Sequence, residues 1–174
     1  MDYAVVLGEA LIDLLESDYD GELIYRQAIG GAPLNVAVGA TRLGGNVQFV
    51  GSLGNDTLGD RIAAFLRKVD VGTTGLKRVP VPTTLAVTTF EGAEPTFQFY
   101  GEPPSYALLG PGDVDTGMVA GATVLYAGSI SLMREPFHLA AQAAWSVPGP
   151  LRVFDPNVRP KLLPDTDAVR ARRS

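Results

Sequence analysis

The chain alternates between short apolar runs and segments with helical periodicity. The run YAVVLG, residues 3–8, ends in glycine and is typical of a strand buried on both faces of a parallel sheet. After Asp56, apolar residues recur at the spacing of one helix face, at Leu58, Ile62, Phe65, Leu66 and Val69. An aspartate at this position predicts an N-terminal helix cap. These patterns favour an α/β fold.

The same alternation continues along the chain and is interrupted once. Strands are expected at 47–53, 123–127 and 151–154, and helices at 33–43, 113–119 and 135–145. Between them, two β-rich arms at 85–90 and 96–100 flank a turn-forming segment, which predicts a hairpin. Because this hairpin interrupts an α/β pattern, we interpret it as a flap or lid.

Composition narrows the possible partners. The chain has 174 residues, of which 46% are hydrophobic and 19% charged, with a formal net charge of -5, so one globular domain with a small neutral or anionic ligand is expected. The basic residues form no cluster before the last few positions, which disfavours nucleic acid and anionic membranes as partners. No cysteine and a single histidine argue against thiolate chemistry and a His-rich metal site.

The expected location follows from the apolar runs. The N-terminus lacks a basic segment followed by a long apolar one, and no apolar run approaches the ~18 residues of a membrane span. We therefore expect a cytoplasmic protein.

A glycine-rich stretch, AIGGAPLNVAVGATRLGG at 28–45, is the first candidate site. Gly30 and Gly31 leave backbone N–H groups uncovered at the start of a helix, which suits an oxygen-rich ligand. The stretch matches neither a Walker loop nor a dinucleotide fingerprint. Asn35 places one amide among apolar residues and could pair with sugar hydroxyls. Alternatively, the glycines only form a turn and Asn35 pairs with neighbouring backbone.

A carboxylate between Ile12 and Leu14 is the second candidate. When ionised, Asp13 can accept two hydroxyl hydrogens at once, which is how a protein holds a diol. The alternative is an exposed charge on an edge strand, and that is the interpretation preferred for Glu9 and Glu16.

Three segments carry a family resemblance. The stretch GGAPLNVAVGATRLGGNVQFVGSLGNDTLGDRI, the opening VVLGEALIDL and the later VFDPNVRPKLL resemble the N-terminal half of ribokinase-like (PfkB) carbohydrate kinases, in their fructokinase-like branch. The resemblance implies a three-layer α/β/α sandwich with a small β lid, to which about 11–28 and 76–100 contribute. It also implies phosphorylation of a sugar hydroxyl with ATP and Mg²⁺.

The resemblance also implies roles for individual residues. The sugar-binding set would be Asp13, Gly30, Gly31, Asn35 and Tyr100. For Tyr100, a place in the core of the lid is the equal alternative. Residues just past the last expected strand, where ligands gather in open α/β sheets, are candidates for the phosphate side of the site: Asp155, Asn157 and Arg159. Arg159 could instead form a surface salt bridge.

The printed chain lacks the family's catalytic segments. A G-A-G-D segment, which supplies a base and an anion site, is absent, and so is the N-x-x-E segment that organises Mg²⁺. No catalytic residue and no metal ligand is therefore expected in this chain. Two functions compete: the sugar-binding half of a kinase, or a non-catalytic sugar-binding remnant or interaction module. Fructose is the favoured substrate, 2-keto-3-deoxygluconate and ribose stay open, and the lid could support a homodimer.

Overall fold

The main sheet forms the centre of the molecule. The computed structural model describes residues 2–91 and 94–157. In this part of the chain, five parallel strands lie in the order β5-β4-β1-β8-β9. They are β1 (Ala4–Leu7), β4 (Val47–Gly54), β5 (Gly72–Val79), β8 (Val124–Gly128) and β9 (Leu151–Asp155). The strand β5 was not predicted, because it is not a distinct apolar run.

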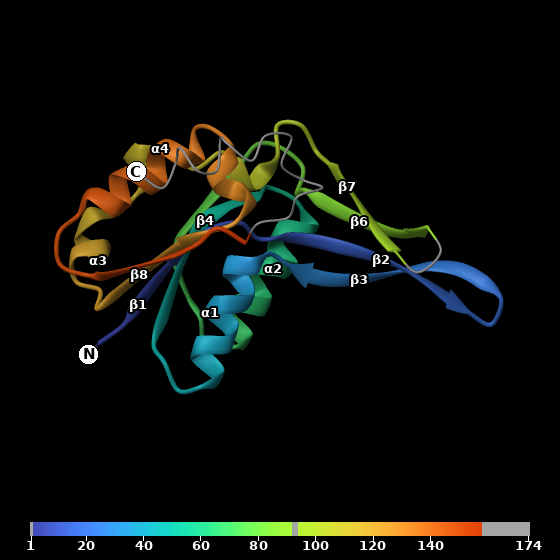
Figure 1. Ribbon diagram of the computed structural model, residues 1–174, viewed down its shortest axis with the longest axis horizontal. Coiled ribbons are helices and arrows are strands. Elements are labelled where there is room, and N and C mark those ends of the chain that lie inside the picture. Colours follow the sequence, from blue (N-terminus) through green and yellow to red (C-terminus); the bar gives the residue numbers. More distant parts are fainter. Residues whose placement is uncertain (1, 92–93, 158–174) are drawn as a thin grey trace.

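Helices cover both faces of this sheet, and Figure 1 shows α1 and α2 on the side opposite α3 and α4. The helices are α1 (Ala32–Arg42), α2 (Thr57–Lys68), α3 (Thr116–Ala120) and α4 (Phe137–Ser146). Side chains alternate along β1, so Val6 packs in the core below α1 and α2 whereas Val5 and Leu7 pack below α3 and α4. The predicted three-layer α/β/α sandwich is confirmed. Within the described residues, no helix has the length and apolar character needed to cross a membrane.

A second sheet extends away from the main one, as Figure 1 shows. Its order is β3-β2-β6-β7. The strands are β2 (Leu11–Tyr19), β3 (Glu22–Gly30), β6 (Leu85–Glu91) and β7 (Glu94–Tyr100). Antiparallel pairing of β6 with β7 confirms the predicted hairpin, and we call this sheet the lid. The expected second lid range of 76–100 includes 76–79, which instead pair with β4 in the main sheet.

Local signals at helix ends had mixed outcomes. The predicted Asp56 cap is confirmed, because the Gly59 N–H donates to Asp56 Oδ1 at 2.8 Å. The helix expected at 113–119 is shorter than predicted: a 3-10 turn (Pro111–Asp113) comes first, and α3 then begins after its own cap, Asp115. The proline and glycines before Asp113 favour the tight turn over a longer helix. Two further 3-10 turns, Ser105–Ala107 and Ile130–Met133, complete the elements.

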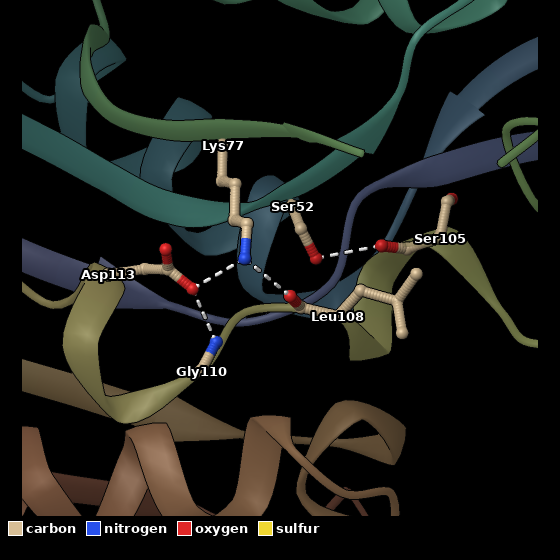
Figure 2. A network of polar contacts seen from close by, with 6 residues as sticks. All are labelled: Ser52, Lys77, Ser105, Leu108, Gly110 and Asp113. Carbon is tan, nitrogen blue, oxygen red and sulfur yellow. Dashed lines mark hydrogen bonds and ion pairs between the residues drawn. The ribbon is translucent and has the colours of Figure 1, made fainter. Parts of the chain in front are cut away.

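The segment that returns from the lid is tied to the main sheet by the polar contacts in Figure 2. Lys77 Nζ on β5 lies 2.7 Å from Asp113 Oδ2 and donates to the Leu108 carbonyl at 3.2 Å. Ser52 Oγ on β4 donates to the Ser105 carbonyl at 2.7 Å. The chain that follows β7 is therefore held against β4 and β5.

The segment that enters the lid is held by one carboxylate. Asp56, besides capping α2, accepts hydrogen bonds from Thr83 N at 2.7 Å and from Thr83 Oγ1 at 2.6 Å. Burial alone would raise the pKa of Asp56, but the bonds from Thr83 and from the α2 backbone outweigh it and hold this pKa below its ordinary 3.8. The first turn of α2 and the start of β6 therefore share one anchor.

Candidate functional site

A cleft of about 180 Å³ lies between the lid and the carboxyl ends of β1, β8 and β9. The lid contributes Leu11, Asp13, Leu15, Ala86, Thr88, Phe97 and Phe99. The opposite wall and floor come from Gly31, Ala32, Asn35, Glu9, Ser129, Ile130 and Asn157. Polar groups converge on a mainly apolar wall, which is the usual composition of a small-molecule site.

Asp13 lies on β2 inside the lid rather than at its edge, because β2 pairs with both β3 and β6. The glycine pair makes room for its carboxylate: a Cβ on Gly30 would lie only 2.7 Å from Asp13 Cγ. Gly31 has a φ of 119°, and a Cβ there would meet the backbone of Glu9 and lie 3.1 Å from the Ala10 Cα. Gly31 is thus needed for a backbone conformation with positive φ, and Gly30 for the close approach of the Asp13 carboxylate, so the pair does more than form a simple turn.

Asn35 is exposed in the first turn of α1 and lines the same cleft. Its backbone N–H bonds to the Gly31 carbonyl within the helix, so a polar contact from Asn35 to a ligand would come from its side-chain amide. The start of α1, with no acidic residue in its first turn, brings backbone N–H groups and partial positive charge to this wall. Asp13, Gly31 and Asn35 are thus brought together as expected, while Gly30 packs beneath the Asp13 carboxylate.

The buried acid Glu9 corrects an expectation. The sequence predicts exposed charges at Glu9 and Glu16, but Glu9 is only 2% exposed and forms part of the cleft floor, and Glu16 is partly buried on β2. Ser131 N–H donates to Glu9 Oε2 at 3.3 Å, yet burial dominates and raises the pKa of Glu9. Burial and then the Glu9 charge also raise the pKa of nearby Tyr106 to about 12. A polar residue directly after a buried strand was the signal that could have identified Glu9.

The phosphate-side candidates separate into two groups. Asn157 lines the cleft and its Nδ2 donates to Ser129 Oγ at 3.1 Å. The Asp155 carboxylate instead accepts hydrogen bonds from Tyr126 OH at 3.1 Å and from Asn157 N at 2.9 Å, and Asp155 is not among the lining residues. Asp155 therefore shapes the loop that presents Asn157. Arg159 lies outside the described residues.

Tyr100 is not brought to the cleft. Alternate residues of a strand face opposite sides, so Phe97 and Phe99 of β7 line the cleft while Tyr100, 49% exposed, does not. The two phenylalanines are the aromatic residues that sequence reasoning missed. The alternation along TFQFY could have identified them once the cleft face of the lid was known.

The described residues include no cluster of metal-ligating side chains. Across 2–91 and 94–157 no group of three or more His, Cys, Asp or Glu side chains is placed to hold a metal ion. The Asp155 carboxylate, beside the phosphate-side candidate Asn157, accepts two hydrogen bonds from the protein.

Comparison with known proteins establishes the family. Residues 1–173 match the model of the pfkB family of carbohydrate kinases, so the chain belongs to this family. It is 38% identical over 175 residues to fructokinase-2 of Zea mays, covering 95% of this chain and 52% of that protein. Fructokinase-2 of Solanum lycopersicum is 36% identical, with 95% and 53% covered. The chain thus spans about half the length of the curated relatives that it matches.

Solved structures agree with this assignment. A crystal structure of fructokinase from Xylella fastidiosa with bound ATP superposes with a TM-score of 0.84 at 34% identity. The match covers 94% of this chain and 51% of the fructokinase chain. The α/β fold with its separate lid is therefore the ribokinase-like fold of these kinases.

Proposed function

We propose that this chain is the sugar-binding part of an ATP-dependent kinase that phosphorylates a fructose-like sugar. The observation that carries the proposal is the convergence of Asp13, Gly31 and Asn35 on one cleft under the lid. An ionised Asp13 can accept two sugar hydroxyls, and Asn35 can both donate and accept. The rings of Phe97 and Phe99 offer an apolar wall for the C–H face of the sugar.

The lid would shield the reacting hydroxyl from water, which otherwise competes as the phosphoryl acceptor. ATP, when bound with Mg²⁺, would supply the phosphoryl group. Because the printed chain has no G-A-G-D segment, it lacks the base and anion site, each worth ~10²–10⁴-fold in rate. We therefore infer that these 174 residues bind sugar without transferring phosphate efficiently.

The direct test is to titrate the purified chain with fructose, ribose and 2-keto-3-deoxygluconate in turn and to measure the affinity for each sugar by NMR. Asp13→Asn should weaken fructose binding ~10- to 100-fold, because it removes a charged acceptor from the hydroxyls. Glu16→Gln is the matched control, since Glu16 lies on the same strand but on the face turned away from the cleft. Equal weakening by both variants, or no sugar binding by the unmodified chain, would contradict the proposal.

A transfer assay with ATP, Mg²⁺ and the same sugars completes the test. We expect no turnover above background from the chain alone. Turnover at an ordinary kinase rate would show that the base lies within these residues and would overturn our assignment of the chain as a binding part only.

We also infer that the lid pairs with a second copy of the chain. Large apolar side chains are exposed on both faces of the lid: Tyr19 (71%) lies on the face that carries Asp13, and Leu23 (66%) and Tyr25 (45%) lie on the opposite face. Apolar side chains exposed next to one another, as Leu23 and Tyr25 are, mark candidate protein interfaces. Sedimentation velocity should show a dimer that Leu23→Lys dissociates. If the chain were a monomer at all concentrations, the inference that two lids pair would be refuted.

A further inference from the structure

One hydroxyl in the lid wall of the cleft is buried without a partner. Thr88 on β6 is 4% exposed and lines the cleft. Among residues 2–91 and 94–157, no hydrogen-bond partner is present for its Oγ1. Buried hydroxyls are nearly always hydrogen-bonded in folded proteins, because an unpaired one loses its interaction with water and gains nothing in return.

The strand register explains why this hydroxyl has no protein partner. Thr88 lies opposite Leu15 on β2 and opposite Phe97 on β7, and both of these neighbours also line the cleft. Their side chains carry no oxygen or nitrogen that could pair with a hydroxyl. The Thr88 hydroxyl is therefore a single polar group within an apolar part of the wall.

The next residue provides an internal comparison. Thr89 lies on the opposite face of the lid, where its Oγ1 is 2.7 Å from Thr96 Oγ1 across the strand pair. Two consecutive threonines on one strand thus differ in how their hydroxyls are paired: the outward one is paired within the protein, whereas the one on the cleft side is buried without a partner among the described residues. Valine at position 88 would have nearly the same shape without an unpaired polar atom.

We propose that Thr88 Oγ1 forms a hydrogen bond with a hydroxyl of the bound sugar and helps to select sugars that carry a hydroxyl at that position. This rests on the proposed function, since it names a contact in the same site. Asp13 and Asn35 bind from the base of the lid and from α1, and Thr88 adds a polar contact from the middle of the lid. A site that pairs with a hydroxyl discriminates against the analogue that lacks it.

The experiment compares Thr88→Val, Thr88→Ser and Thr89→Val with the unmodified chain. Thr88→Val should bind fructose about 3- to 15-fold more weakly, and Thr88→Ser should retain most of the affinity. Without sugar, Thr88→Val should melt at the same or a higher temperature, because it removes a buried unpaired hydroxyl. Thr89→Val should melt at a lower temperature, since it breaks the pair with Thr96, and should leave fructose affinity unchanged.

A series of monodeoxy fructose analogues identifies the hydroxyl that is bound. The unmodified chain should bind the analogue that lacks this hydroxyl more weakly than fructose. Thr88→Val should bind that analogue and fructose equally well, because removing the sugar hydroxyl and removing the Thr88 hydroxyl delete the same hydrogen bond. If Thr88→Val bound fructose as tightly as the unmodified chain, or if no analogue lost its penalty, the assignment of Thr88 would be wrong while the sugar site stood. If the unmodified chain bound no sugar, the proposed function and the role of Thr88 would both fail.

Discussion

Asp56 should stabilise the chain by much more than a helix cap alone. Its carboxylate accepts one bond from the α2 backbone, at Gly59 N, and two from Thr83 at the entrance to the lid. The loss of an N-cap costs ~1 kcal/mol, and each hydrogen bond to a charged group contributes ~1.5–3 kcal/mol when buried. Because Asp56 is only partly buried, we take the lower values. Asp56→Ala should then reduce the free energy of unfolding by ~3–4 kcal/mol.

Asp115 supplies the matched control. It caps α3 through one bond from Met118 N at 2.9 Å, and within residues 2–91 and 94–157 no hydrogen bond joins its carboxylate to the lid. Asp115→Ala should therefore cost only ~1 kcal/mol. The fluorescence of the single tryptophan, Trp145, a partly buried residue of α4 that packs against the core between the main sheet and α3 and α4, would report the urea denaturation of both variants.

A double-mutant cycle with Thr83→Val isolates the lid contact. Since Thr83 Oγ1 donates to Asp56 Oδ1, the coupling energy between the two substitutions should be ~1 kcal/mol or more. The contribution of Asp56 requires the ionised carboxylate, whose pKa lies below 3.8, so it is present above that pH and is lost as the pH falls through the folded-state pKa. If Asp56→Ala cost no more than Asp115→Ala, or if the cycle gave no coupling, the shared anchor would be refuted.

Three further predictions concern separate parts of the molecule. Burial raises the pKa of Glu9 above its ordinary 4.5, so the folded chain binds more protons than the unfolded chain and its free energy of unfolding should fall as the pH rises from 4.5. Urea denaturation at several pH values should show that this free energy depends less on pH in Glu9→Gln, and an unchanged pH dependence would contradict the prediction. Gly31→Ala, at φ 119° and against the backbone of Glu9, should cost ~2 kcal/mol or more, whereas Gly39→Ala, in open space on α1, should stabilise by ~0.5–1 kcal/mol; equal effects would disprove the close approach. Among the described residues β9 is an outer strand of the main sheet and exposes Val153 (39%), and an open edge of this kind favours association between copies, so Val153→Lys should lower the light scattering of the chain; unchanged scattering would exclude contact through this edge.

Much of the fold could be predicted from local patterns. The helix after Asp56 and its cap, the buried strand at the N-terminus and the hairpin of the lid each depend on side chains within a few residues of one another. Hydrophobic periodicity and capping act over this same short range, so the sequence carries them directly. Asp13 and Asn35 were also visible, because each is a polar residue in an apolar segment.

Only the tertiary structure decided how these pieces meet. Whether Glu9 is buried depends on the loop after β8, more than a hundred residues away, whose Ser131 bonds to it. Whether Phe97 or Tyr100 faces the cleft depends on which side of the lid lies toward α1, and the pattern of β7 alone does not specify this. Thr88 and Thr89 are chemically identical, and they differ because strand pairing gives one a polar neighbour and the other an apolar one. Burial and partner choice are set by contacts between distant segments, which no local pattern encodes.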